Sequence, residues 1–389
     1  MGLQFLETLW PVFGFARFLG MFPCRRIRKE NGSVEMRAMN GKVQWILYGC
    51  LSIIIIISSL SVSTWNYLRS EKTYEEVTQC QDEKSGGSKM DFYSFIVVML
   101  LNGLVVITIQ YGNFKMRDGL CEAFYELEAN PEGSLLVPFF TACGLLAPSM
   151  LMFPLFTVWS PRDCLSLRWT DLIPSFIFNG IQILHLYIPM LVFLAISLEY
   201  FGCLTFKMFQ VKILLKQRKL NQFLLNCTLN MVITLEKSAA QLSFNFFWIM
   251  ATVSVQILVL LYLVPANFIN YSKVNEPILL FNSVMTLLND VYFCSLMWII
   301  NIRAQKVTDL VHQVKEEFQD IYPDDDLMVS YECQTLPASF MRDRIIQKMN
   351  KFTGFDGKGY FILGKSFLKG FLSFCLTYFV ILLQFKLSE

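Results

Sequence analysis

Residues 370–385 of the 389-residue chain read GFLSFCLTYFVILLQF, an apolar run without a charged side chain. Sixteen helical residues span only about 24 Å, which is less than the roughly 30 Å hydrocarbon core of a bilayer. Some positions recur at steps of three and four residues and therefore share one helical face; these are Gly370, Ser373, Thr377, Ile381 and Gln384. This mostly small or polar stripe predicts close helix packing or, because the helix is short and carries an amide near its end, a surface that faces water.

The composition of the chain places this run in a membrane protein. Hydrophobic residues make up 54% of the chain and charged residues only 16%, and the mean hydropathy is +0.46. Typical soluble chains carry about 25% charged residues, because surfaces that face water need them. The net charge is only +2, which argues against nucleic acid as a partner.

Six further apolar stretches approach or exceed the length that a membrane-spanning helix needs. Together with residues 370–385 they predict an all-α membrane protein with seven transmembrane helices; the six are residues 43–65, 93–112, 135–159, 172–198, 244–264 and 278–302. The apolar pattern of the fourth stretch continues to about residue 215. Residues 303–318 are periodic but too polar for lipid, so both segments predict helices that extend out of the membrane.

Basic residues are distributed unevenly between the two sides of these spans. Of the 33 Lys and Arg residues, 23 lie on the side of the N-terminus and eight on the other side. Because basic loops stay in the cytoplasm, this split predicts a cytoplasmic N-terminus and an extracellular C-terminus, the reverse of a G-protein-coupled receptor. Cys80 and Cys164 are then extracellular, and a disulfide between them is a hypothesis that peptide maps with and without reductant would test.

The last span also matches a family pattern. Residues 377–385 read TYFVILLQF, which is a Thr-Tyr pair, five apolar residues and a Gln-Phe pair. The run resembles the TYhhhhhQF signature, with h any hydrophobic residue, that closes the seventh helix of arthropod gustatory receptors. Upstream, Gly359-Tyr360-Phe361 resembles the Gly-aromatic-Phe stretch of the same receptors. The chain is therefore similar to this family, which is related to insect odorant receptors.

The resemblance implies a ligand-gated, non-selective cation channel in the plasma membrane, assembled as a homotetramer or as a heteromer with other gustatory receptors. It implies that the last helix of each subunit lines the pore. Gln384 and Phe385 would form the extracellular constriction, and the residues beneath them on the pore helix would be Ile381, Tyr378, Thr377 and Ser373.

The resemblance also implies a cytoplasmic anchor domain. Extensions of helices four to six and the first half of a two-part seventh helix would form it, and four glycines within residues 354–364 favour such a break. The predicted divisions are a cytoplasmic segment (1–42), six helices (43–302), an anchor region (303–369) and the pore helix with its tail (370–389). The acidic run Asp324-Asp325-Asp326 is expected in a solvated loop, with a cation-attracting rim as the alternative.

Polar side chains inside apolar spans indicate where a ligand could bind, because lipid disfavours them without partners. The resemblance places a tastant, either a sugar or a bitter compound, in the outer halves of helices two to six. Candidate contacts are Asn179, Gln182 and His185 of the fourth span, Trp248, Gln256 and Tyr262 of the fifth, and Asn282, Thr286, Asn289 and Asp290 of the sixth. The alternative for the amides and His185 is hydrogen bonding to a neighbouring helix. Asp290 is the hardest to explain in that way.

The sequence gives little support to other chemistries. Eleven cysteines without a C-x-x-C pair and only two histidines give no metal-ligand pattern. No nucleophile triad or phosphate loop stands out, so we expect no metal, no cofactor and no enzymatic activity. A transporter is a third option, weaker than a channel or a receptor-like protein, because no internal repeat is evident. The open alternative is a gustatory-receptor-like membrane protein with a non-sensory or non-conducting role.

Overall fold

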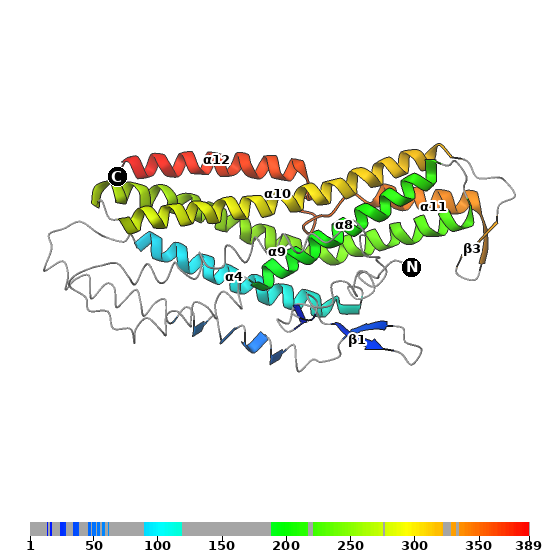
Figure 1. Cartoon of the computed structure of the whole chain (residues 1–389), viewed down its shortest axis with the longest axis horizontal. Coiled ribbons are helices and arrows are strands. Elements are labelled where there is room, and N and C mark those ends of the chain that lie inside the picture. Colours follow the sequence, from blue (N-terminus) through cyan, green and yellow to red (C-terminus); the bar gives the residue numbers. More distant parts are fainter. Residues whose placement is uncertain are drawn as a thin grey trace.

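The computed structural model describes residues 24–28, 34–38, 89–118, 188–216, 221–274, 277–321, 328–331 and 334–388, together with scattered residues between 14 and 61. Most of the described residues are helical, and Figure 1 shows the helices running lengthwise in an elongated bundle. The helices are α4 (Lys89–Lys115), α8 (Ile188–Lys216), α9 (Gln222–Val274), α10 (Pro277–Gln319), α11 (Ala338–Lys351) and α12 (Lys365–Ser388).

Four of the predicted spans fall entirely within these helices. Residues 93–112 lie in α4, 244–264 in α9, 278–302 in α10 and 370–385 in α12. The span at 135–159 and the first part of the span at 172–198 lie outside the described residues, and only scattered helical residues are described in the span at 43–65. By length and composition, two stretches of the described chain could cross a membrane, Leu191–Lys216 and Gln222–Val259.

The helices extend beyond the apolar spans, as the periodicity predicts. α8 continues to Lys216, and α10 runs without a break from Pro277 to Gln319. α9 is the longest helix, with 53 residues, or about 80 Å at 1.5 Å per residue. Because α8, α9 and α10 all extend in this way, one end of the bundle consists of these extensions together with α11 (Figure 1).

Two short β-hairpins accompany the helices of this all-α fold. β1 (Cys24–Arg28) pairs antiparallel with β2 (Val34–Ala38), and β3 (Met328–Tyr331) pairs antiparallel with β4 (Gln334–Pro337). The second hairpin follows the acidic run for which the sequence predicted a solvated loop. Val329 of β3 is fully buried, so burial of this side chain contributes to holding the strand. The acidic run at 324–326 lies outside the described residues.

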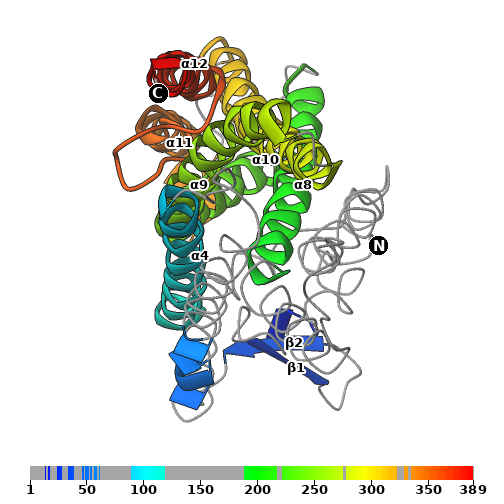
Figure 2. The ribbon, with the colours of Figure 1, turned by 90° about the vertical axis from the view of Figure 1, so that its left-hand side faces the viewer.

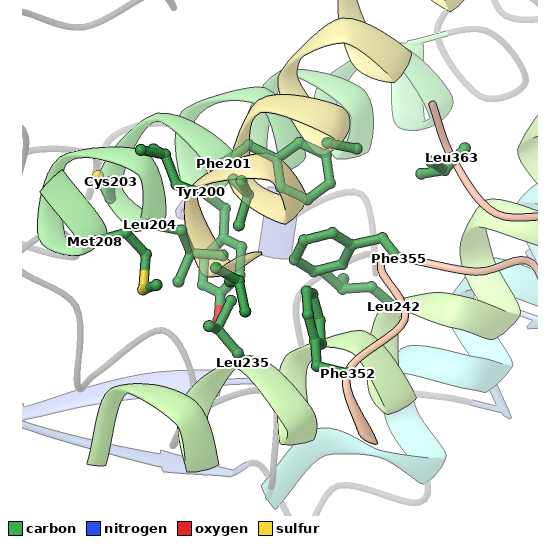
Figure 3. Packing of buried hydrophobic residues seen from close by; sticks show 14 of the residues in the cluster. Tyr200, Phe201, Cys203, Leu204, Met208, Leu235, Leu242, Phe352, Phe355 and Leu363 are labelled. Atoms are coloured by element: carbon green, nitrogen blue, oxygen red, sulfur yellow. The ribbon is translucent and has the colours of Figure 1, made fainter. Parts of the chain in front are cut away.

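The core of the bundle lies where α8, α9 and α10 meet. Its largest fully buried side chains include Tyr200 and Phe201 of α8, Phe246 of α9 and Phe318 of α10. The Tyr200 hydroxyl is hydrogen-bonded to the Ser238 hydroxyl across the α8–α9 contact. This bond satisfies a polar group that would otherwise be costly to bury. Figure 3 shows this part of the core, with side chains from several elements packed together.

Polar contacts hold α11 against the extended ends of α9 and α10. The Lys348 ammonium lies 2.7 Å from the Glu236 carboxylate of α9. The Arg342 guanidinium donates hydrogen bonds to the backbone carbonyls of Phe318 and Gln319 at the end of α10. The last carbonyls of a helix lack partners within it, so Arg342 serves as an external cap.

Candidate functional site

The predicted two-part seventh helix corresponds to α11 and α12, which are separated by residues 352–364. This linker folds back on itself. The N–H of Gly357 donates to the carbonyl of Phe361 at 2.8 Å, and the N–H of Leu363 donates to the carbonyl of Phe355 at 2.7 Å. The fold-back requires left-handed backbone at its turns, where Gly354 has a φ of 125° and Gly359 a φ of 78°.

The linker is anchored in the core by two aromatic rings. Figure 3 shows Phe352 and Phe355 reaching from the linker toward Phe201 and Leu242. The Phe355 side chain is fully buried, and its ring centroid lies 4.7 Å from that of Phe201 and 5.6 Å from that of Phe352. The segment that leads into α12 is therefore part of the folded core.

We expect that Gly354→Ala destabilises the protein by about 1–3 kcal/mol. The substitution forces a side chain into left-handed backbone, and its Cβ would lie 2.9 Å from Ile362 Cγ2. Thermal melting of the detergent-solubilised protein measures the effect. The matched control is Gly202→Ala in α8, where a Cβ meets no atom within 4 Å and a helical alanine should stabilise by about 0.5–1 kcal/mol. Equal melting temperatures for the two variants would contradict this account of the turn.

α12 packs on α9 and α10 through one narrow face. Its buried side chains are Leu368, Phe371 and Cys375, which follow one another at steps of three and four residues. The ring of Phe367 stacks between those of Phe361 and Phe371, at centroid distances of 4.5 Å and 6.3 Å. These contacts fix the rotation of α12 about its own axis.

The predicted stripe of α12 lies on the opposite side of the helix. At 100° per residue its centre is roughly 160° from the centre of the buried face. All five of its residues are exposed: Gly370, Ser373, Thr377, Ile381 and Gln384. The Thr377 hydroxyl donates to the Ser373 carbonyl at 2.9 Å. Figure 2 shows α12 at the edge of the bundle, so the stripe faces away from the rest of the chain.

Apolar residues flank the stripe on both sides. Leu372, Leu376 and Val380 are exposed on one flank, and Phe374 and Tyr378 on the other. The rings of Phe374 and Tyr378 lie 5.0 Å apart, so Tyr378 belongs to a flank rather than to the stripe itself. Phe385 lies in α12, and its side chain is outside the described residues. A helix with apolar flanks needs a cover of lipid or protein.

The ligand-binding candidates are spread along the bundle. Asn179, Gln182, His185, Cys80 and Cys164 lie outside the described residues. Asn282, Thr286, Asn289 and Asp290 lie on the first third of α10, at the end of the bundle where α12 terminates (Figure 1).

The three candidates on α9 do not form one cluster. Trp248 and Tyr262 are half-buried and Gln256 is buried. Tyr262 follows Trp248 by fourteen positions, which is about 21 Å along the helix. Beside Trp248, the ring of Phe247 lies 5.1 Å from that of Tyr360 in the linker. Trp248 is therefore level with the start of α12, far from its other end.

The structure also brings together polar residues that the sequence analysis did not select. The Asn245 side chain of α9 donates to Asn113 Oδ1 of α4 at 2.6 Å, and both residues are buried. Asn301 and Gln305 of α10 contact the start of α12. An asparagine within an apolar helix is a signal that could have identified Asn113, Asn245 and Asn301.

Comparison with known proteins gives a match in structure only. No protein-family model matches the chain, and no curated protein sequence does. The insect olfactory receptor OR5 from Machilis hrabei in complex with eugenol superposes with a TM-score of 0.56 at 15% identity, over 97% of this chain and 98% of that one. The chain has the fold of an insect olfactory receptor. A second structure of the same olfactory receptor superposes with a TM-score of 0.52 at 14% identity, with the same coverage of both chains.

The olfactory-receptor fold agrees with the fold that the resemblance implied. The match covers nearly the full length of both chains, although it rests on structure at low sequence identity. The signature at residues 377–385 and the predicted spans together thus pointed to the insect chemoreceptor fold, while the cytoplasmic position of the N-terminus stays a prediction.

Proposed function

We propose that this protein is a gustatory-type chemosensory receptor and acts as a ligand-gated, non-selective cation channel. Four subunits, either identical or mixed with related receptors, would surround one pore lined by α12. The observation that carries this proposal is the exposed stripe of α12, which lies opposite the face that packs on α9 and α10. The insect olfactory-receptor fold supports it, and no catalytic step is proposed.

A central pore would explain both the stripe and its flanks. Hydroxyl and amide groups in contact with lipid are unfavourable, whereas they are hydrated in a water-filled channel. The apolar flanks would then pack against the α12 helices of neighbouring subunits or against lipid. Ile381 is 40% exposed. In the proposed tetramer, the four Ile381 side chains would form an apolar constriction next to Gln384. Such a constriction can close a pore by excluding water.

We place the ligand at the end of the bundle where α10 begins and α12 ends. Asn282, Thr286, Asn289 and Asp290 of α10 and Tyr262 of α9 occur in this part of the chain. With a cytoplasmic N-terminus this end is extracellular and open to a sugar or a bitter compound. Polar side chains next to aromatic rings suit such a ligand. The insect olfactory receptor of similar fold was solved in complex with the small molecule eugenol.

Current recordings test the proposal directly. The chain is expressed alone in cells, its surface amount is measured, and a panel of sugars and alkaloids is applied under voltage clamp. We expect at least one compound to evoke a cation current that untransfected cells lack. Surface protein without any evoked current would favour the alternative, a receptor-like membrane protein with a non-sensory or non-conducting role.

Cysteine substitution tests which face of α12 meets water. We expect a charged, membrane-impermeant thiol reagent to reduce the current of Thr377→Cys by more than half while leaving the wild type unchanged. Native Cys375 lies on the buried packing face and should not react. The control is Leu372→Cys, which is also exposed in the single chain but lies roughly 140° from the centre of the stripe. Equal modification of both variants would argue against a pore lined by the stripe.

A further inference from the structure

The amino end of α12 receives its cap from another helix. The first N–H groups of a helix lack partners within it and are commonly satisfied by the side chain of the preceding residue. Gly364 precedes α12 and has no side chain. Instead, Asn301 Oδ1 of α10 accepts a hydrogen bond from the Gly364 N–H at 2.9 Å, and Gln305 Oε1 accepts one from the Lys365 N–H at 3.4 Å.

Both amides are held in the orientation that this cap requires. Asn301 is fully buried, and its Nδ2 donates to the Met297 carbonyl at 2.8 Å, so its oxygen points toward the linker. Gln305 Nε2 donates to Asp309 Oδ1 at 2.7 Å. A Cβ on Gly364 would overlap the Gln305 side chain, so this close approach depends on glycine. We call Asn301 and Gln305 the α12 clamp.

We infer that the α12 clamp positions the amino end of the pore helix on α10 and transmits movement of α10 to it. The transmission rests on the proposed channel function. α10 carries both the clamp and the ligand-binding candidates of the sixth span. Asp290 precedes Asn301 by eleven residues, or about 16 Å along one unbroken helix. Rigid elements joined by specific hydrogen bonds are a physical route for coupling two sites.

The linker offers a matched control for the clamp. Ser243 Oγ of α9 accepts a hydrogen bond from the Lys358 N–H at 2.8 Å. Like the clamp bonds, this bond joins an uncharged side chain to a linker N–H. Its side chain belongs to α9, however, and its N–H belongs to Lys358, six residues before Gly364. Ser243→Ala therefore removes one linker contact without touching the start of α12.

Amide hydrogen exchange of the purified full-length protein tests the positioning, whether or not the protein conducts. We expect residues 361–368 to exchange about 2- to 10-fold faster in Gln305→Ala and Asn301→Leu than in the wild type. The double variant Gln305→Glu with Asp309→Asn keeps an oxygen that accepts from the Lys365 N–H and an amide hydrogen bond between positions 305 and 309, so it should restore protection. Ser243→Ala should leave residues 361–368 unchanged. The Gln305 variants decide the test, because Gln305 is half-buried and substitution of the fully buried Asn301 also destabilises the fold. Wild-type exchange in Gln305→Ala would refute the positioning role.

Current recordings with an equimolar mixture of sucrose, fructose, caffeine and quinine test the transmission. At equal surface amounts, we expect Gln305→Ala to shift the half-maximal concentration by about fivefold or more. The double variant Gln305→Glu with Asp309→Asn, and Ser243→Ala, should behave like the wild type. An unchanged response in Gln305→Ala, alongside faster exchange, would refute transmission and leave positioning supported. A wild type that conducts in no condition would refute a channel formed by this chain alone, and transmission within it, while the exchange data still decide positioning.

Discussion

Gln384→Ala should raise the basal cation current, without ligand, by about tenfold. The side chain is exposed at the outer end of the α12 stripe, where the proposed pore is narrowest. If the glutamine amide stabilises the closed state by about 1.4 kcal/mol, its loss raises the population of a rarely occupied open state about tenfold. Phe385→Ala should act in the same direction, because it removes an apolar ring from the same constriction.

Whole-cell currents normalised to surface protein measure the effect of these substitutions. Leu372→Ala is the matched control, since Leu372 is an exposed residue of α12 that lies off the stripe. A similar leak in Leu372→Ala would point to a general weakening of the helix. Unchanged basal and evoked currents in Gln384→Ala and Phe385→Ala would remove both residues from the gate.

Phe355→Ala should cost about 3–5 kcal/mol of folding stability. The ring is fully buried between Phe201 and Phe352, so alanine leaves a cavity in the contact between the linker and α8. A typical protein is stable by only about 5–15 kcal/mol. We therefore expect most of the variant to be retained inside the cell or to melt at a much lower temperature.

Size-exclusion profiles of the heated, detergent-solubilised protein measure this loss. Phe223→Ala is the control, because Phe223 at the start of α9 is 71% exposed and its truncation creates no cavity. A Phe355→Ala protein that melts like the wild type would show that the linker is not an integral part of the core.

The long helices could be predicted from sequence because their signal is local. The apolar pattern of α8 persists through residues 198–215. Apolar residues that recur at steps of three and four indicate a helix without any knowledge of distant contacts. The stripe of α12 was predicted on the same basis. The sequence left close packing and a water-facing surface as alternatives for it, because the choice depends on how Leu368, Phe371 and Cys375 pack on other helices.

The remaining features depend on contacts between distant residues. Phe355 lies in a glycine-rich stretch that resembles a loop, and its burial follows from contact with Phe201, far away in the sequence. The hairpin β3–β4 has strands of four residues each, too short for a periodic signal. Asn301 and Gln305 were missed because their partners are backbone groups about sixty residues later in the chain. Sequence periodicity does not encode such pairs.

In the proposed channel, the distance between the α12 clamp and Gln384 would set the angular scale of pore opening. From Lys365 to Gln384, α12 extends about 28 Å. With the amino end acting as a pivot, a tilt of only about 7° displaces Gln384 sideways by about 3.5 Å. Opposite subunits tilting together would widen the constriction by about 7 Å, which is enough to admit a cation with part of its water shell. The proposed pore would therefore open without unfolding of α12 and without a break within it.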